Sequence, residues 1–345
     1  MQVIRNIPGF KITKKLPLNS IPKFDKYFLQ EIEFTHSSTT PVLKISNAFI
    51  NHAGFVFNPL RPVKVFSNQM GQNKINLFRA TLSQIKKILT RKITKKSGTH
   101  VVIHNNYTEN YYHFTLEILP KLFILKDFIH SSKIILPKPV KQFQLEFLEA
   151  FSELNFEIVE INPEFNIKTE TLYCMGSLCP YSNHNPSILL QFSRYIKEKL
   201  KQKIYSSKEE NKRIYISRSD AKYRRILNEE VVVSYLVSKG FSCIQLETYS
   251  VAKQIKIFSN AEIVIGAHGA ALTNIIFCKP ETKVIELFNT DYIHLCYFNL
   301  KDIFSLQYYY LVGDAVYNDG QEYWSSDIVL NINDIKNLVD KYLLP

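Results

Sequence analysis

The sequence predicts an α/β protein in which two Rossmann-like domains face a central cleft. Apolar, strand-like runs alternate with amphipathic, helix-like segments, a pattern typical of parallel βαβ units. The alternation occurs in two series, which the turn-rich segment 180–187 separates. The length of 345 residues suffices for two domains of ordinary size. We therefore expect an N-terminal domain over residues 1–185, a second domain over 186–330, and a C-terminal helix over 331–345 that packs back on the first domain.

The first series is regular from residue 99 onward. The runs 41–50 and 55–59 suggest strands and 81–91 has a helical pattern, but residues 1–100 are otherwise hard to assign. A long helix is expected over 107–128, bent or broken at Pro120. The other expected elements of this half are strands at 99–104, 133–137, 156–161 and 171–176 and a helix at 141–151.

The second series begins with a helix over 189–204. The helix at 228–240 has the clearest ends, because Asn228 can cap its first turn, acidic residues follow the cap, and Gly240 can end it. The remaining expected elements are strands at 212–217, 241–246, 261–267, 282–288 and 305–312 and helices at 250–259, 270–278 and 331–343.

Composition narrows the class of protein. Hydrophobic residues make up 46% and charged residues 21% of the chain, as in soluble globular proteins. No apolar run reaches the length of about 18 residues that a membrane-spanning helix needs, and the N-terminus lacks the apolar core of a signal peptide. The 5 cysteines are scattered, without a Cys-x-x-Cys pair, which argues against a disulfide framework or a zinc site. We expect a cytoplasmic protein with reduced thiols.

The net charge of +12 has two interpretations. It favours a phosphate-rich partner, such as nucleic acid, an anionic membrane or an anionic substrate. It equally fits an abundance of lysines that solvate the surface, since no long basic run occurs. One local basic cluster, at Lys222, Arg224 and Arg225, is more informative.

Two strand ends of the second half carry residues suited to binding phosphate. Ligands of open parallel sheets bind at the carboxyl ends of the strands. Arg218 directly follows one strand, and the cluster with Arg224 and Arg225 lies in the next loop, where guanidinium groups can bind phosphate oxygens or simply be solvated. After the strand at 261–267 come residues that would let a phosphate reach free helix amides, with a histidine able to donate to it or to serve the structure instead: His268, Gly269, Ala270 and Ala271.

A third strand end contains an acid. Glu286 lies within the otherwise apolar strand at 282–288. An unpaired buried carboxylate is costly, so it needs a partner. A ribose diol could donate two hydrogen bonds to it, and an intramolecular partner such as an arginine is the alternative.

The second half resembles the core of a known family. The runs YISRSDAKYRR (215–225), FSNAEIVIGAHGAALTN (258–274) and ETKVIELF (281–288) are similar to glycosyltransferase family 61, the DUF563-type proteins. The resemblance is specific over 213–288 and extends from about residue 100 to 290. It implies a GT-B fold, inverting transfer, independence from metal and a nucleotide-binding role for five residues: Arg218, Arg225, His268, Gly269 and Glu286. Glu281 departs from the glycine usual there, which affects only a turn.

The run HNNYTENYYHFTLEILPKL (104–122) resembles the family's other motif. His113 and Glu117 are spaced i, i+4 and share a helix face. Such a pair suits a general base that takes the proton of an attacking hydroxyl, with either residue as the base, or it is a surface pair without a role. Asn110 and Lys121 are the expected acceptor-binding residues, Lys121 standing where arginine is usual.

The expected reaction is an in-line displacement at the anomeric carbon. The acceptor hydroxyl, activated by His113 or Glu117, attacks, and the nucleoside diphosphate leaves against Arg218, Arg225 and the amides of 269–271. We expect no cofactor and no metal: the chain has no Asp-x-Asp pair, and His104 with His113 lacks a third ligand.

Two other functions remain open. A polysaccharide pyruvyltransferase of GT-B-like fold would use phosphoenolpyruvate and would not need Glu286. A basic nucleic-acid-binding protein would need a basic stripe with exposed aromatics, whereas the 20 tyrosines and 24 phenylalanines look like core and cleft residues.

The expected partners are a nucleotide-sugar donor, UDP-linked by preference, and an oligosaccharide or lipid-linked acceptor of capsule or lipopolysaccharide type. The positive charge suits peripheral association with the inner membrane. No nucleic-acid partner is expected.

Overall fold

The computed structural model describes residues 1–36, 38–57, 86, 90–204 and 212–343, and the chain divides into two compact units. The first unit comprises residues 1–11 and 35–199, and the second comprises 12–34 and 200–345. The division falls after α6 (Pro186–Lys199) because this helix packs on α4 (Leu119–Leu125), with the rings of Phe192 and Phe123 6.1 Å apart. The helical pattern expected at 81–91 lies largely outside the described residues.

The first unit is built on a mixed sheet in the order β1-β4-β9-β6-β7-β8. Four parallel strands confirm the expected βαβ pattern: β6 (Lys92–Val102), β7 (Lys133–Pro137), β8 (Glu157–Ile161) and β9 (Phe165–Met175). The remaining strands form an antiparallel part of the sheet: β1 (Gln2–Ile7), β4 (Thr40–Asn51) and β5 (Val56–Phe57). β4 matches the strand expected at 41–50 and β5 lies within the one expected at 55–59, whereas β1 and the antiparallel pairing were not predicted. β4 covers the edge of β9, an edge that parallel connections alone leave open.

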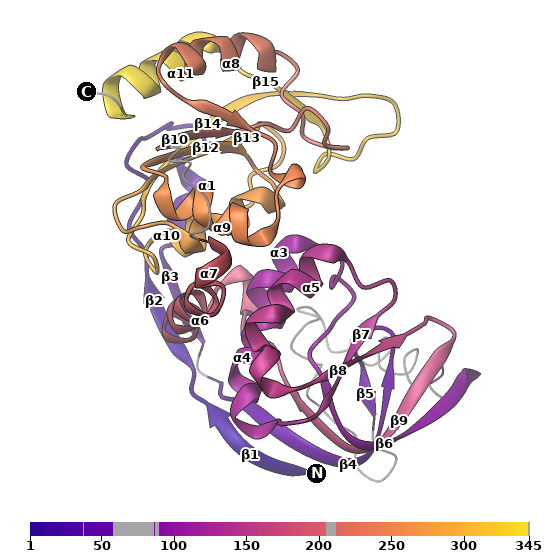
Figure 1. The fold of residues 1–345 in the computed structure, drawn as a ribbon. Helices are drawn as coiled ribbons and strands as arrows, with labels where there is room; N and C mark the ends of the chain where they lie inside the picture. The colour runs from indigo at the N-terminus through magenta and orange to yellow at the C-terminus, as the bar shows by residue number, and fades with distance from the viewer. Residues whose placement is uncertain (37, 58–85, 87–89, 205–211, 344–345) are drawn as a thin grey trace. The chain divides into compact units, whose positions relative to one another are not determined.

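The helices of this unit lie on one face of the sheet (Figure 1). Most of their buried side chains are apolar, and Phe114, Leu122 and Phe147 are each 0% exposed. The remaining elements are α3 (Tyr111–His113), η2 (Phe114–Ile118), η3 (Lys126–Phe128), α5 (Gln142–Leu148), η4 (Glu149–Leu154) and η5 (Pro180–Ser182).

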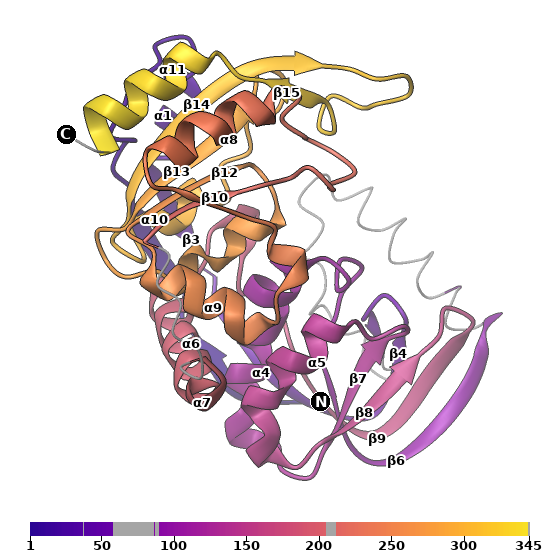
Figure 2. The same cartoon turned by 45° about the horizontal axis from the view of Figure 1, so that its top comes forward.

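The second unit is a doubly wound sheet in the order β11-β10-β12-β13-β14-β15. Every strand is parallel to its neighbours except the last, which is antiparallel. α8 and α11 cover one face and α9 the other (Figures 1 and 2). The strands are β10 (Arg213–Ile216), β11 (Ser242–Ile244), β12 (Ile263–Ala267), β13 (Lys283–Asn289), β14 (Gln307–Val316) and β15 (Asp327–Val329). The helices are α7 (Lys201–Ile204), α8 (Glu229–Ser238), η6 (Leu246–Thr248), α9 (Val251–Asn260), η7 (Ala270–Phe277), α10 (Phe298–Lys301), α11 (Ile332–Leu338) and η8 (Val339–Leu343).

The ends of α8 confirm one predicted signal and correct another. Gly240 follows the helix with φ +81°, a conformation that favours glycine. Asn228 occupies the N-cap position, but its side chain does not cap the helix. Its amide instead donates to the carbonyl of Leu330 at 2.7 Å and its oxygen accepts from the Leu330 amide. A partner distant in sequence has therefore replaced the amides of the helix's own first turn.

The C-terminal helix packs on the second unit, which corrects the expectation that it returns to the N-terminal domain. Ile335, Leu338 and Val339 join the core of that unit with residues of β12 and β13. Lys283 of β13 also donates to the carbonyls of Tyr342 and Leu343 at 3.1 Å. The apolar face of the helix is thus buried within its own unit.

Residues 12–34 complete the second unit from far away in sequence. Phe28 of α1 (Asp25–Leu29) is 0% exposed and lies 4.5 Å, ring to ring, from Tyr310 of β14. The hydroxyl of Tyr310 donates to Asp25 at 2.7 Å. Two short strands, β2 (Phe10–Thr13) and β3 (Glu33–His36), pair with each other on either side of this segment. Within the described part of the chain, no helix has the length and apolar character needed to cross a membrane.

Candidate active site

The motif of the first unit begins in the loop that follows β6. Thr108 and Asn105 hold this loop: the Asn105 amide donates to Thr108 Oγ1 at 2.9 Å, and the Thr108 hydroxyl donates to the Asn105 carbonyl at 2.6 Å. Asn110 then caps α3 by accepting from the amides of Tyr112 and His113. Asn110 is exposed, so it fixes the start of the helix while its expected contact with an acceptor stays a prediction.

The helix after Asn110 is not broken at Pro120. It runs through a π-helical turn, η2, and continues into α4, of which Pro120 is the second residue. The amide of Leu119 donates to the carbonyl of Phe114, five residues earlier. A proline ring clashes with the carbonyl four residues before it, and a wider turn relieves that clash. The irregularity therefore lies one turn before the proline, at the residues that carry Glu117.

His113 and Glu117 meet on this turn as the spacing predicts. His113 Nδ1 lies 3.0 Å from Glu117 Oε1, with the two side chains 29% and 19% exposed. This contact is not aligned as a hydrogen bond. Tyr107 stacks on the imidazole with ring centroids 4.8 Å apart, and Asn105 Nδ2 donates to Glu117 Oε2 at 3.5 Å. The pair is thus held from both sides and remains partly open to solvent.

Glu117 is charged at neutral pH. Burial alone would raise its pKa, but the contact with His113, followed by the electrostatic effects of the nearby His184 and Lys121, outweighs burial, so the pKa lies below its usual value. Sequence reasoning missed His184, because it lies in the segment that was interpreted as a linker. His184 is 2% exposed and contacts Tyr112 at 3.4 Å and Cys179 at 3.3 Å.

Lys121 does not lie where an acceptor could contact it, which corrects its expected role. Its side chain is among the largest fully buried ones, and Nζ donates to the carbonyl of Ile103 at 3.5 Å. Burial lowers its pKa to about 8, while the charge of Glu117 works in the opposite direction. His104 is buried as well, with its ring nitrogens near the carbonyls of Ile135 and Asn51, so its role is structural.

In the second unit, two predicted site segments follow neighbouring strands. Counted from β10, the parallel strands run in the order 2-1-3-4-5, so the chain reverses direction across the sheet between β10 and β12. Ligands of doubly wound sheets bind in the crevice at this point, beyond the carboxyl ends. Arg218 comes two residues after β10, and His268 comes directly after β12. The topology thus brings together what the sequence places 50 residues apart.

Arg218 is tied to its surroundings. Its Nη2 donates to the carbonyl of Tyr223 at 2.8 Å and its Nε to that of Arg224 at 3.3 Å. Burial, followed by the charge of Arg224, lowers the pKa of Arg218. A Cβ added at Gly269 would lie 2.0 Å from Arg218 Nη1. Gly269 is therefore small because the guanidinium occupies the space beside it.

The two other arginines, Arg224 and Arg225, have different partners. Arg224, with φ +56°, donates from Nε to the carbonyl of His268 at 2.9 Å and from Nη1 to that of Trp324 at 2.8 Å. Arg225 instead forms a two-pronged ion pair with Asp327, with Nη2 2.8 Å from Oδ2. Arg224 thus belongs to the candidate site, whereas Arg225 is bound to Asp327 of β15. The sequence did not identify Asp327 as the partner of Arg225.

Glu286 has intramolecular partners, so its burial needs no ribose. It is 0% exposed, it contacts His268 Nδ1, and it accepts from the Tyr308 hydroxyl at 2.5 Å. Burial raises the pKa of Glu286 to about 8, against the effect of Tyr308. Burial, followed by the charges of Arg224 and Arg218, lowers the pKa of His268. The partner is a histidine rather than the arginine weighed from the sequence.

The small residues after β12 begin a 3₁₀ helix, η7, instead of the expected α-helix. Gly269 is buried, while Ala270 and Ala271 are half-buried at the first turn. The Tyr297 hydroxyl donates to the Gly269 carbonyl at 2.7 Å, and Asn274 donates to Gln254 of α9 at 2.9 Å. The turn is thereby fixed at both ends.

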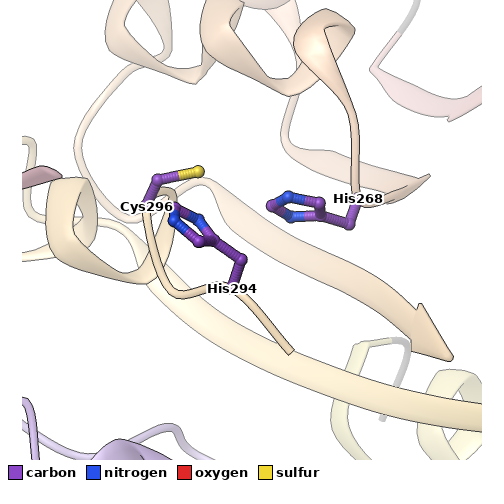
Figure 3. Close-up of side chains that lie close together, drawn as sticks. All are labelled: His268, His294 and Cys296. Carbon is purple, nitrogen blue, oxygen red and sulfur yellow. The ribbon is translucent and has the colours of Figure 1, made fainter. Parts of the chain in front are cut away.

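His268 also belongs to a cluster that sequence reasoning missed. His268, His294 and Cys296 place one potential metal-ligating atom each within 4.8 Å of the others (Figure 3). The available signal was the His-x-Cys spacing of 294–296. Among the described residues, these three are the histidine, cysteine or acidic side chains that lie close enough together to hold a metal ion.

Two surface cavities lie away from both motifs. One of about 510 Å³ in the first unit is lined by residues of β6, β8 and β9, and one of about 550 Å³ in the second unit lies at the amino end of β14. Neither lining includes a predicted site residue. We give more weight to the strand ends, because ligands of doubly wound sheets bind at the carboxyl ends of the strands.

Comparisons with known proteins match both motif regions. A family model described as glycosyltransferase 61 matches residues 111–285, about half of the chain. The EGF domain-specific O-linked N-acetylglucosamine transferase of Canis lupus familiaris is 28% identical over 129 residues, which is 36% of this chain and 24% of the relative. The enzyme of the same name from Drosophila melanogaster is 31% identical over 128 residues, with the same shares. The matched part thus spans about a quarter of these relatives. By the extent of the family match, the chain belongs to the glycosyltransferase 61 family.

Proposed function

We propose that the chain transfers a sugar from a nucleotide-sugar to an acceptor hydroxyl with inversion at the anomeric carbon. The observation that carries this proposal is the pairing of Arg218 with the His268–Gly269 turn on either side of the reversal point of the second sheet. A cationic group beside a close-approach backbone turn suits a diphosphate. Family membership supports sugar transfer as the reaction.

His113 is the proposed base. Glu117 has a lowered pKa, which makes it a weak proton acceptor, and it contacts His113 Nδ1. A carboxylate in that position orients an imidazole and stabilises its protonated form. His113 Nε2 then takes the proton of the acceptor hydroxyl as the oxygen attacks the anomeric carbon. The bond to the diphosphate oxygen breaks on the opposite face, and inversion follows from this single displacement.

The leaving diphosphate is proposed to bind the second unit. Arg218 and the amides at the start of η7 face the developing charge, and Arg224 holds the turn through the His268 carbonyl. This division of labour supposes a GT-B arrangement, with acceptor motif and donor motif across a cleft. The reaction is proposed to need no Mg²⁺ or Mn²⁺, because arginine and backbone amides supply the positive charge.

The names of the relatives suggest the first substrates to test. They are N-acetylglucosamine transferases that act on EGF domains, so UDP-N-acetylglucosamine is the leading donor. The proposed acceptor is a hydroxyl of a surface glycan, and a protein hydroxyl, as the relatives' names imply, is the second acceptor class. The net charge of +12 suits a chain that works beside an anionic membrane.

A donor screen with the purified full chain tests the proposal. The chain is incubated with UDP-, GDP- and CMP-sugars, with and without a chelator, and release of free nucleotide is measured with the mass of the acceptor product. We expect free nucleotide to be released from one UDP-sugar, and the chelator should not reduce this release. Consumption of phosphoenolpyruvate without nucleotide release would establish a pyruvyltransferase instead, and salt-sensitive RNA or DNA binding without nucleotide-sugar turnover would make the chain a nucleic-acid-binding protein.

A further inference from the structure

The cluster of His268, His294 and Cys296 comes from two segments that are fastened together. His268 follows β12, and the other two residues lie in the loop between β13 and α10. In Figure 3 the three side chains converge on one another. Tyr297, next to Cys296, donates to the Gly269 carbonyl at 2.7 Å, so the loop is bonded to the turn that carries His268. The start of the loop is held by Asn289, which accepts from the amides of Asp291 and Tyr292.

The ligand set matches one class of metal. Two imidazoles and a thiolate suit a borderline-soft ion such as Zn²⁺ and are poor ligands for Mg²⁺ or Ca²⁺. With ordinary zinc bond lengths and tetrahedral angles, the ligating atoms of such a site lie roughly 3.4–3.6 Å apart. The atoms here lie within 4.8 Å of one another. The three atoms must therefore move closer together when a metal binds, and His294 is the exposed member of the three.

The surroundings of His268 also fit ligation. Metal-bound histidines commonly have their other nitrogen held by a carboxylate. Glu286 contacts His268 Nδ1 and is itself held by Tyr308, so Nε2 is the nitrogen that remains for a metal. None of these features is needed to bind a diphosphate.

We propose that His268, His294 and Cys296 bind a single Zn²⁺ ion, with a fourth coordination position open to water. Binding converts the Cys296 thiol to a zinc thiolate and releases its proton to solvent. His268 adjoins Gly269 in the sequence, where the proposed function places the donor. Zinc and a donor phosphate therefore compete for His268, a consequence that rests on that proposed function. The role is inhibitory and differs from the Mn²⁺ or Mg²⁺ clamp that the transfer reaction is proposed to lack.

Cobalt(II) tests the site without reference to activity. Reduced, metal-stripped full chain is titrated with Co²⁺, and the thiolate-to-cobalt charge-transfer band in the near ultraviolet is recorded. We expect one equivalent bound, displacement by Zn²⁺, and loss of the band in Cys296→Ser with at least tenfold weaker binding. His294→Ala should weaken binding similarly, and Glu286→Gln should weaken it about tenfold by freeing the His268 ring. Cys243→Ser is the matched control, since Cys243 is an exposed cysteine of the same unit. A band that survives in Cys296→Ser, or no binding by the native chain, overturns the proposal.

Two further readings keep this test decisive. The circular dichroism spectrum and thermal transition of each variant show whether a lost band reflects lost ligation or a lost fold, and a folded Cys296→Ser variant without the band supports the site. In the transfer assay, Zn²⁺ should raise the apparent KM for the donor in the native chain and do so far less in Cys296→Ser. A chain that binds Co²⁺ but transfers no sugar refutes the proposed function and leaves the metal site standing.

Discussion

Residues 104–122 of the first unit and residues 213–288 of the second both carry the family pattern, yet they place their charged side chains differently. In the first region His113 and Glu117, the proposed base and its partner, lie on neighbouring helical turns and are 29% and 19% exposed. In the second region the ionisable side chains are bonded to groups of the protein itself. Arg218 and Arg224 donate to backbone carbonyls, and Glu286 is 0% exposed.

This difference separates the pair proposed to move a proton from the groups proposed to hold the donor diphosphate and the turn beside it. A substitution in the first region should remove a proton-transfer step and act on kcat. A substitution in the second region should displace the turn after β12 and act on donor binding. The comparison therefore makes different kinetic predictions for the two motifs.

The largest effect is expected for His113 at the end of α3 and Glu117 on η2. Glu117→Gln keeps the shape of the side chain but removes the charge that orients His113, and His113→Ala removes the proposed base. Each should lower kcat by about 10²–10⁴ with little change in donor KM, because general-base catalysis contributes on that order. Steady-state kinetics with a saturating donor measure this.

Glu109→Gln is the control for that loss of charge. Glu109 is a carboxylate in the same segment, 54% exposed, and its ion-pair partner Lys141 lies 3.6 Å away. Exposed ion pairs contribute little to stability, so this variant should behave like the native chain. Near-normal kcat in both Glu117→Gln and His113→Ala would remove the pair from the mechanism.

The next effect is expected at Gly269. A methyl group there would displace Arg218, because the added Cβ would lie 2.0 Å from Nη1. Losing charge-assisted contacts costs about 1.5–3 kcal/mol, so donor affinity in Gly269→Ala should fall roughly 10- to 100-fold while kcat changes less. Donor binding is measured by titration calorimetry.

Arg218→Ala supplies the test of cause for Gly269→Ala. If the methyl group acts only by displacing the guanidinium, then adding Gly269→Ala to the Arg218→Ala variant costs no further affinity. A further loss of affinity in the double variant would show that the turn itself has moved. In that case the close packing of Arg218 and Gly269 is not what binds the donor.

Local pattern predicted much of the second region. Gly240 ends α8 as expected, and the strand order brings the two predicted strand ends beside the reversal point. The partners of the charged groups could not be predicted, because they are set by contacts distant in sequence. Arg225 pairs with Asp327 across 102 residues, and Asn228 uses Leu330 in place of its own helix.

In the first region the sequence predicted the contact between His113 and Glu117 but not the residues packed around it. The i, i+4 spacing suffices to bring His113 to Glu117. The π-helical turn arises from the steric demand of Pro120, which periodicity does not encode. His184 and Lys121 lie beneath the pair, and burial of that kind becomes visible only once the sheet and helices pack.

A smaller effect concerns the buried ammonium of Lys121. Its pKa in the folded chain, about 8, lies below the unfolded value of 10.5. Between these values the unfolded chain holds the proton and the folded chain does not, so the stability of the native chain rises with pH. Relative to Lys121→Met, the native chain should gain about 1.5 kcal/mol of unfolding free energy between pH 8 and 9.5.

Denaturant unfolding at the two pH values measures this gain. Lys95→Met is the control, because Lys95 is exposed on β6. The unfolding free energy of this variant should change with pH as that of the native chain does. An unfolding free energy that changes equally with pH in the native chain and in Lys121→Met would mean that the ammonium reaches water. Lys121 would then not be a buried ionisable group of the first region comparable with Glu286 in the second.

The smallest effect is expected at the turn before β13, where Glu281 stands in place of the glycine usual in the family. Glu281 has φ +66°, a left-handed conformation that costs a residue with a side chain about 1–2 kcal/mol. Glycine removes that cost but adds unfolded-state entropy of about 0.5–1 kcal/mol, and the hydrogen bond from Gln307 to Glu281 Oε2 is lost. Glu281→Gly should therefore raise the thermal midpoint by no more than a few degrees and leave donor binding unchanged. Glu281→Ala separates the two contributions, since it loses the same hydrogen bond without relieving φ, and it should be less stable than Glu281→Gly. If the alanine variant were the more stable one, the turn would not be strained, and the departure from the family pattern would concern the Gln307 contact instead.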